Sequence, residues 1–461
     1  MSEKATLDEF IGDNEGVLSA EPQGIRLALD ESYPKEWGFA ELEEVCEVNS
    51  GFTWNKEQET DSSEEGAVPV IKIGNVQDGY LDLDDILYLT DVSDEDLREN
   101  KARKDWLLMI GSNGSGERVG HCGIIKEDME FVYASFLYGL HADSDHLLPR
   151  FLFYSLNRPK VQQRLTSFTA GSTSLKNLNK STIENLSIPT SPLPEQRKIA
   201  TVLYTVDRAI EKTEELINQT ERVKAGLTQD LLKSGIGNHQ MVETDSRFGL
   251  LPDSWELQPL EEVGEIAGRT APEKDDTECW GGNIPWATPS EITSLVGQTI
   301  DDTKEHLTDL ALEKVSSNLL PPMSVLMTTR ATIGECAVNT VEMTTNQGFK
   351  NIIPNERIDT WYTYYRLDYE KDYLASLSKG STFPEVGKDT VENFVIPIPP
   401  IEEQREIGEL LRSVDEQILS YKRSKSQYER LKRGLQQDLL SGTVRTTDTN
   451  IEVPDEIAQH G

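Results

Sequence analysis

The sequence lacks the long apolar runs that membrane proteins need. A helix that spans a bilayer requires about 20 consecutive apolar residues, and no segment of this 461-residue chain approaches that length. The acidic amino terminus is also unlike a secretory signal peptide, which begins with positive charge. These absences predict a cytoplasmic protein with no membrane partner.

Disulfide and metal-binding patterns are missing as well. The 4 cysteines are widely spaced without a Cys-x-x-Cys pair, and the 6 histidines are scattered. This pattern predicts free thiols rather than a disulfide framework or a zinc site. His121 beside Cys122 suggests a metal, but the second half of the chain has Glu335-Cys336 there, so a core position is favoured. We expect no metal and no cofactor.

Catalytic motifs are absent too. The sequence contains no phosphate-binding loop for ATP and no glycine-rich cofactor loop after a clear strand. The Asn/Asp-Pro-Pro-Tyr/Phe signature of an amino-methyltransferase is also missing, because Ile398-Pro399-Pro400-Ile401 has apolar residues on both sides of its prolines. The carboxylates are numerous, but no pair stands out as a nuclease site. The chain is predicted to have no catalytic residues and not to be an enzyme.

Positive charge is scarce. The chain has 45 basic and 81 acidic residues, a net charge of -36, and most of the acidic excess lies outside the tails and the helices described below. This sign opposes nucleic-acid binding, in which lysine and arginine neutralise phosphates. A salty cytoplasm would resolve the conflict, since the screening length falls to about 3 Å near 1 M salt. Full solubility and maximal stability at low salt would contradict that hypothesis.

The chain does contain one helical stretch twice, with an offset of 208 residues between Leu193 and Ile401. Each copy opens with Glu-Gln-Arg and closes with Gln-Asp-Leu-Leu. Between them, seam residues recur at alternating steps of four and three, the 3.5-residue repeat of a coiled coil. In the first copy they are Ile199, Leu203, Val206, Ile210, Thr213, Ile217, Thr220, Lys224, Leu227 and Leu231. In the second they are Ile407, Leu411, Val414, Ile418, Tyr421, Lys425, Tyr428, Lys432, Leu435 and Leu439.

Each such helix would be roughly 55 Å long and would leave its apolar seam in water unless a partner covered it. Either copy alone could be an ordinary amphipathic helix at a domain edge. Two matched copies instead predict that the helices pack against each other. Polar seam positions weaken that packing but can fix its register, and they are Thr213, Thr220, Lys224, Lys425 and Lys432.

Repetition extends beyond the helices. Leu251-Pro252-Asp253-Ser254-Trp255 repeats the pattern of Tyr33-Pro34-Lys35-Glu36-Trp37, and short β-rich runs with glycine and proline follow in both halves. Short helices are expected at 148–165 and 360–377. The fold class is therefore α+β, with two similar mixed α/β domains separated by two long antiparallel coiled-coil helices and related by a pseudo-two-fold axis.

The predicted boundaries follow this order. They are an acidic, largely disordered tail at 1–31 with one short helix near Leu7 to Ile11, a first domain at 32–192, a central helix at 193–236, a second domain at 247–399, a C-terminal helix at 400–442, and an acidic tail at 443–461.

The duplicated order of these motifs resembles the specificity subunits of type I restriction-modification systems. The resemblance covers roughly residues 32 to 445. It rests on Glu-Gln-Arg, the long helix and Gln-Asp-Leu-Leu, each time after a variable segment that ends in Gly-Ser-Thr and Ile-Pro. It implies that the two domains are target-recognition domains for double-stranded DNA, and that the helices separate them and bind methyltransferase subunits.

Polar and basic residues on turns are the candidates for reading bases, since arginine fits guanine and asparagine or glutamine fits adenine. For each of them a solvated turn or a phosphate contact is the alternative, and the glycine-rich Gly111 to Gly116 is better explained as a hairpin turn than as a phosphate cradle. The candidates are Lys72, Asn75, Arg118, Ser172, Thr173, Lys176, Arg330, Asn346, Gln347, Lys350, Lys379, Ser381 and Thr382.

The sequence thus predicts a non-catalytic DNA specificity subunit of a type I restriction-modification complex. It would recognise a bipartite, asymmetric target and scaffold adenine methyltransferase (M) and restriction and translocation (R) subunits. The alternative is a protein-assembly scaffold that binds no DNA, which an acidic surface would suit.

Overall fold

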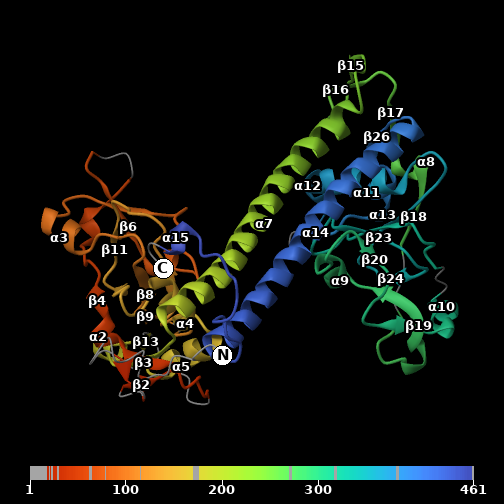
Figure 1. Cartoon of the computed structure of the whole chain (residues 1–461). Coiled ribbons are helices and arrows are strands. Elements are labelled where there is room, and N and C mark those ends of the chain that lie inside the picture. The colour runs from red at the N-terminus through yellow and green to blue at the C-terminus, as the bar shows by residue number, and fades with distance from the viewer. Residues whose placement is uncertain are drawn as a thin grey trace. The chain divides into compact units, whose positions relative to one another are not determined.

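Two long helices, α7 (Leu193–Ser234) and α14 (Ile401–Leu440), run through the structure (Figure 1). Each is followed by a glycine with a left-handed backbone, Gly235 at φ 73° and Gly442 at φ 70°. Glycine adopts this conformation without the penalty that a Cβ atom would bring, so it ends a helix readily. The duplicated helix and its glycine stop are confirmed.

The computed structural model describes residues 18–19, 21, 24–27, 31–61, 65–77, 79–114, 116–169, 176–268, 272–315, 319–379 and 384–458. Contacts divide the chain into unit 1, Met1–Glu211 with Ser426–Gly461, and unit 2, Lys212–Lys425. Each long helix therefore begins in one unit and ends in the other. Both units therefore contain residues of both helices.

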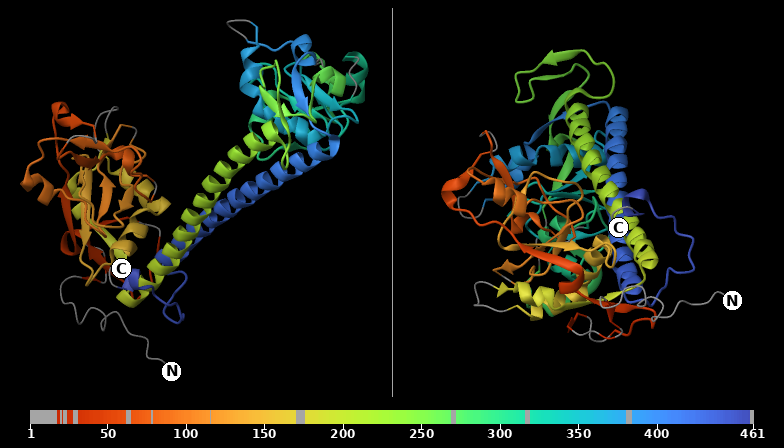
Figure 2. Two further views of the ribbon diagram at one scale, coloured as in Figure 1. Left: turned by 90° about the horizontal axis from the view of Figure 1, so that it is seen from above. Right: turned by 60° about the vertical axis from the view of Figure 1, so that its left-hand side comes forward.

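The two helices pack against each other within each unit (Figure 2). In unit 2, ion pairs join Lys425 to Glu214 at 2.8 Å and Lys422 to Glu221 at 2.8 Å. Residue numbers rise along one helix as they fall along the other, so the pair is antiparallel. The seam residue Ile217 is buried from solvent. The predicted pairing of the two copies is confirmed.

Lysines at two seam positions bind aspartates of the opposite helix, of which Asp415 is buried and Asp207 is half-buried. Lys224 Nζ lies 2.7 Å from Asp415 Oδ1 in unit 2, and Lys432 Nζ lies 2.6 Å from Asp207 Oδ1 in unit 1. The two contacts are equivalent, because both residues shift by the same offset of 208 residues. A charged seam position paired in this way fixes the register of the helices.

Each of these aspartates also binds its globular region. The hydroxyl of Tyr365 donates to Asp415 Oδ2 at 2.8 Å, and the hydroxyl of Tyr154 donates to Asp207 Oδ2 at 2.8 Å. Burial, reinforced by the neighbouring Asp415 carboxylate, raises the pKa of Tyr365, so its phenol stays protonated and remains a donor. One carboxylate per unit therefore joins both helices to the globular core.

A buried glutamine in the first turn of each helix provides a second attachment. Gln196 Oε1 accepts from the backbone N–H of Leu148 at 2.9 Å, and Gln404 Oε1 accepts from that of Asp359 at 2.8 Å. Each side-chain nitrogen donates to two backbone carbonyls. Because the whole amide group is paired, this glutamine orients the helix against the short helices of its unit.

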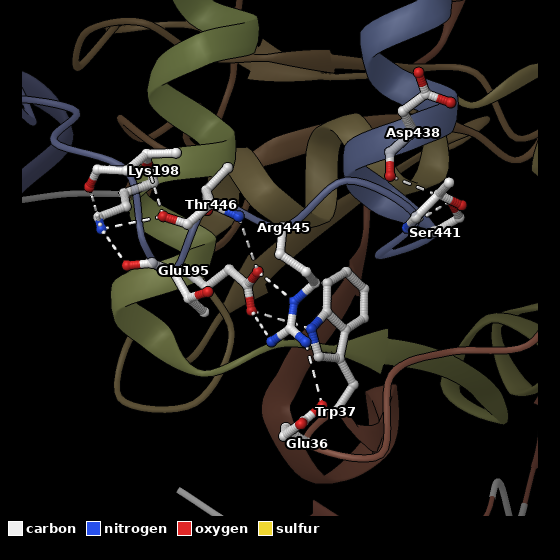
Figure 3. Close-up of polar contacts among 11 residues, drawn as sticks. Glu36, Trp37, Glu195, Lys198, Asp438, Ser441, Arg445 and Thr446 are labelled. Atoms are coloured by element: carbon white, nitrogen blue, oxygen red, sulfur yellow. Dashed lines mark hydrogen bonds and ion pairs between the residues drawn. The ribbon is translucent and has the colours of Figure 1, made fainter. Parts of the chain in front are cut away.

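The glutamate before this glutamine accepts hydrogen bonds from the segment that follows the other long helix (Figure 3). In unit 1, Arg445 donates to both oxygens of Glu195 at 2.8 and 2.9 Å, and Trp37 Nε1 donates to Glu195 Oε2 at 3.1 Å. In unit 2, Trp255 Nε1 and the backbone N–H of Ile236 donate to Glu403 at 3.2 and 2.8 Å. The duplicated Glu-Gln thus connects three separate parts of the chain in each unit.

A buried arginine binds the last turn of each helix. Arg158 Nη1 donates to the carbonyl of Leu440 at 3.3 Å, and Arg366 Nη1 donates to that of Leu232 at 2.7 Å. Their charge is balanced by Glu31 at 2.6 Å and Glu370 at 2.5 Å, respectively. Unsatisfied carbonyls at a helix C-terminus favour such cations.

In the residues that the structure describes, unit 1 contains three four-stranded sheets and a small two-stranded sheet. Their orders are β1-β3-β14-β2, β10-β8-β12-β4, β11-β6-β7-β5 and β13-β9. The strands are β1 Leu18–Ser19, β2 Ile25–Arg26, β3 Gly38–Glu41, β4 Cys46–Ser50, β5 Glu59–Thr60, β6 Val68–Ile71, β7 Leu87–Leu89, β8 Leu107–Ile110, β9 Ser112–Asn113, β10 Cys122–Ile124, β11 Val132–Tyr133, β12 Leu137–Ala142, β13 Lys176–Asn177 and β14 Leu186–Thr190.

Helices of unit 1 cover this core. They are α2 Leu42–Val45, α3 Asp94–Glu99, α4 Pro149–Leu156, α5 Pro159–Ser167, α6 Lys180–Glu184 and α15 Asp455–Ala458, with the 3-10 turns η1 Lys56–Gln58 and η2 Ile73–Asn75. The main core combines strands and α4 with Ile199 and Leu203 of α7 and with Leu439 and Leu440 of α14. The helices predicted at 148–165 are confirmed as α4 and α5.

Unit 2 has a five-stranded sheet, β18-β25-β22-β23-β20, beside β21-β19-β24 and the pairs β17-β26 and β15-β16. The strands are β15 Met241–Glu243, β16 Leu250–Pro252, β17 Glu256–Pro259, β18 Gly264–Ala267, β19 Trp280–Ala287, β20 Thr299–Ile300, β21 His306–Leu307, β22 Val325–Met327, β23 Cys336–Asn339, β24 Thr344–Thr345, β25 Asn351–Pro354 and β26 Val395–Ile398. The α+β fold class is thus confirmed in both units.

The helices of unit 2 repeat the arrangement of unit 1. They are α8 Leu260–Val263, α9 Pro289–Thr293, α10 Asp309–Val315, α11 Thr360–Tyr369, α12 Lys371–Ser376 and α13 Lys388–Glu392, with the 3-10 turn η3 Thr277–Cys279. The main core includes Tyr362 and Tyr365 of α11 with Ile407 and Leu411 of α14. The short helices predicted at 360–377 are confirmed.

The two tails differ from expectation. The N-terminal segment is not wholly irregular, because β1 pairs with β3 and β2 pairs with β14. The short helix predicted near Leu7 to Ile11 lies outside the described residues. At the other end, Lys198 Nζ donates to three backbone carbonyls of 446–449, and Ile457 is fully buried. In the described residues, backbone pairing and one apolar anchor thus hold parts of both segments against unit 1.

Replacing Asp415 with alanine tests the attachment of the helices in unit 2. Removing one partner of a buried ion pair typically costs about 3–5 kcal/mol. We expect the free energy of unfolding to fall by about 3 kcal/mol, measured by urea unfolding followed by tryptophan fluorescence. The control is Lys422→Gln, which removes an exposed pair and should cost less than about 1 kcal/mol. Equal effects of the two variants would contradict this role for Asp415.

Candidate nucleic-acid interface

Three segments with predicted site residues meet in unit 2, at the ends of β22 and β25. The backbone N–H of Thr329 donates to the carbonyl of Gly348 at 2.7 Å, and that of Lys350 donates to Met327 at 3.0 Å. The N–H of Val386 donates to Thr329 at 3.1 Å. The loops that contain Arg330, Asn346 to Lys350, and Lys379 are therefore held together by backbone hydrogen bonds.

This site is locally basic although the chain is acidic. Arg330 Nη2 lies 3.0 Å from Glu385 Oε1, and Lys379 exchanges two backbone hydrogen bonds with Glu385. Burial lowers the pKa of Lys350; nearby Glu385 opposes this shift, whereas Arg330 and Lys388 add to it. Lys388 also pairs with Glu392 at 3.1 Å. Four basic side chains, Arg330, Lys350, Lys379 and Lys388, thus lie on the segments that meet here, and such side chains can neutralise phosphates.

Asn346 and Gln347 lie on the loop that follows β24. Asn346 Oδ1 accepts from the backbone N–H of Gly348 at 2.8 Å, so it stabilises the turn. Asn346 is half-buried, and Gln347 is exposed. Gln347 is therefore the more accessible of the two amide side chains.

In unit 1 the structure brings three predicted residues together around η2. Arg118 Nη2 donates to the carbonyl of Val76 and to Gln77 Oε1 at 3.4 Å. This places Arg118 beside the turn that contains Lys72 and Asn75. Lys176 lies elsewhere, on β13, where it pairs with Asn113 of β9.

Asn75 is unsuited to reading a base without a rearrangement. Its Oδ1 accepts from the N–H of Lys72 at 2.8 Å, and its Nδ2 donates to the carbonyls of Asp82 at 2.9 Å and Asp85 at 3.0 Å. The side chain is buried. Its sequence position, in a polar turn after a strand, resembles that of an exposed reader, but its contacts are those of a residue that shapes the loop.

Four predicted residues, Ser172, Thr173, Ser381 and Thr382, lie outside the described residues. The glycine-rich stretch from Gly111 connects β8 to its antiparallel neighbour β10, in which Cys122 pairs with Met109. Within that connection, however, Ser112 and Asn113 form β9 and pair with β13, so the stretch is not a simple hairpin turn.

Sequence reasoning missed Phe136, Glu385 and Lys388. Phe136 is 51 % exposed, and its carbonyl accepts from the N–H of Gly111 at 2.9 Å, as Gly348 accepts from Thr329 in unit 2. An exposed aromatic ring at this position can contact a thymine methyl group. For Phe136 and Glu385 the internal repeat could have given the signal, because they align with Gly348 and Asn177, which lie next to the predicted Gln347 and Lys176.

All four cysteines are free thiols, as predicted. Burial raises the pKa of Cys46 to about 12 and also raises that of Cys122, so both thiols stay protonated and are poor metal ligands. Within the described ranges, no group of three metal-binding side chains is found, and no helix is long and apolar enough to cross a membrane.

Comparisons with known proteins agree with this architecture. The family model for the type I restriction modification DNA specificity domain matches residues 34–222 and 252–430. The MjaX specificity subunit of Methanocaldococcus jannaschii, named as a type I restriction enzyme subunit, is 24% identical over 418 residues, covering 89% of this chain and 94% of the relative. The MjaIX specificity subunit of the same organism is 35% identical over 191 residues, covering 41% of this chain and 44% of the relative.

A solved structure shows the same fold. The type I restriction-modification S subunit from M. genitalium superimposes with a TM-score of 0.57 at 16% identity, covering 89% of this chain and 97% of that chain. Two copies of the domain, each joined to the paired helices by the same contacts, define a duplicated specificity subunit. The chain belongs to the type I restriction-modification DNA specificity family.

Replacing Asn75 with alanine tests whether this residue shapes its loop. The change leaves a backbone N–H and two carbonyls without their partner, and each unsatisfied buried group costs about 1–3 kcal/mol. We expect a lower melting temperature for Asn75→Ala and no change for Lys72→Gln, measured by thermal unfolding. An unchanged melting temperature for Asn75→Ala, with altered DNA preference, would instead make Asn75 a base reader.

Proposed function

We propose that this chain is a non-catalytic cytoplasmic subunit that recognises an asymmetric, bipartite sequence in double-stranded DNA. The observation that carries the proposal is the duplicated attachment. Gln196 and Gln404 make the same contacts in the two units, while the candidate interfaces of the units carry different side chains. Two unlike recognition surfaces on one polypeptide suit two unlike half-sites.

The same proposal assigns protein partners. As a specificity subunit, the chain would bind adenine methyltransferase (M) subunits for protective methylation, together with restriction and translocation (R) subunits for cleavage. This is supported by the names of its relatives, which are specificity subunits of type I restriction enzymes. It is also supported by the absence from the sequence of a phosphate-binding loop and a methyltransferase signature, so that both activities would come from other subunits.

Selection from a random duplex library tests this function. The full chain, with and without its methyltransferase subunits, is incubated with the library at several salt concentrations, and bound DNA is sequenced. Enrichment of a split motif supports DNA recognition. Failure to enrich any motif, even with the methyltransferase present, would favour a protein-assembly scaffold that binds no DNA. The net charge of -36 would suit such a scaffold.

Insertion of one heptad tests the spacer role of the helices. Seven residues inserted only in α7, after Thr220, should abolish selection of the split motif, because the copies can no longer keep register. Each globular region should remain folded by circular dichroism. Inserting a heptad in both helices is the matched control and should restore a motif with a spacer about three base pairs longer, since seven residues add about 10.5 Å. An unchanged spacer in the double insertion would contradict the spacer role.

A further inference from the structure

The two units place different side chains at one equivalent position of their candidate interfaces. In unit 1 the backbone N–H of Leu178 donates to Gly111 at 2.8 Å, and in unit 2 that of Val386 donates to Thr329 at 3.1 Å. The residue after each acceptor faces a partner on the neighbouring segment. Ser112 pairs with Asn177, and Arg330 pairs with Glu385.

The side chains of these pairs differ in size, charge and exposure. Ser112 Oγ donates to Asn177 Oδ1 at 2.7 Å, and Ser112 is only 7% exposed. Arg330 and Glu385 form an ion pair at 3.0 Å with 46% and 36% of their side chains exposed. The first pair is therefore short, neutral and largely covered. The second presents a long cation to solvent at the corresponding place.

Glu385 restricts the orientation of the Arg330 guanidinium but pairs with only one of its nitrogens. An arginine side chain has five N–H donors in a planar fork, and the ion pair uses the Nη2 edge. The remaining donors are free to meet two acceptors that lie side by side, such as O6 and N7 of guanine in the major groove. Lys350 and Lys379 lie on the adjoining segments, where they can neutralise flanking phosphates.

We propose that Arg330 reads a guanine in the half-site bound by unit 2, and that Glu385 is the positioning residue that orients it. The inference deepens the proposed function and rests on it. Unit 1 has no cation at the equivalent Ser112, so it must read its own half-site in another way. This proposal attributes part of the target's asymmetry to the difference between Ser112 in unit 1 and Arg330 in unit 2.

The test repeats the library selection with the full chain and its methyltransferase subunits. Arg330→Gln should lower the preference for guanine at one position of one half-site by about tenfold to a hundredfold, the usual range for a bidentate contact. The other half-site should be unchanged. Glu385→Gln should weaken the preference at the same position by a smaller factor, because the guanidinium remains but is no longer oriented.

The matched control is Arg357→Gln, which removes another half-exposed arginine of unit 2, paired with Glu256 at 3.3 Å. It should leave every position of the motif unchanged. A uniform loss of affinity for all sequences in Arg330→Gln, with a salt dependence reduced by about one contact, would make Arg330 a phosphate contact and overturn the inference. An unchanged motif, or a change at a base other than guanine, would overturn it as well.

Two further outcomes separate the possible failures. If the unaltered protein enriches no split motif, the proposed function fails, and this inference fails with it. If Arg330→Gln loses the whole half-site, unit 2 has unfolded, and Glu385→Gln then decides. A guanine-specific loss in that variant supports the inference, and an unchanged motif overturns it.

Discussion

One aspartate in each unit, paired on both sides, is the constraint on which the arrangement depends. Asp207 and Asp415 each accept from a tyrosine of the globular region and pair with a lysine of the opposite helix. A carboxylate taken out of water must be paired and hydrogen bonded, or its burial costs several kcal/mol. Sliding either helix by one turn would break both contacts at once. The same two carboxylates therefore fix the register of the helices and hold each globular region against them.

The helices and the duplication could be predicted because both are local properties of the sequence. The 3.5-residue repeat and the Glu-Gln opening are visible in one copy and are confirmed by the other. The partners of the seam lysines could not be predicted. Lys224 meets Asp415 only after the antiparallel register is set, and that register depends on residues about 190 positions away in sequence. Likewise, nothing in the composition of the acidic tails indicated that Ile457 would be buried.

The candidate interface was predictable only in part, because its loops carry no periodic signal. A polar residue after a strand can face solvent or cap its own turn, and the sequence pattern is the same for both. Arg330 and Lys379 do lie together, whereas Asn75 proved to be enclosed by its loop. Glu385 was overlooked because an acidic residue is unexpected on a DNA-binding surface. Its importance follows from its contact with Arg330, which only the fold reveals.

The division of the chain also has a consequence for synthesis on the ribosome. Unit 2 is continuous in sequence, from Lys212 to Lys425, so all of its partners have emerged once that stretch is made. The core of unit 1, in contrast, needs Leu439 and Leu440, which are translated only after the whole of unit 2. Contacts of such long sequence separation form slowly. Most of unit 1 is therefore translated before unit 2, but part of its apolar surface stays uncovered until Leu439 and Leu440 are made. Unit 1 thus completes its fold last.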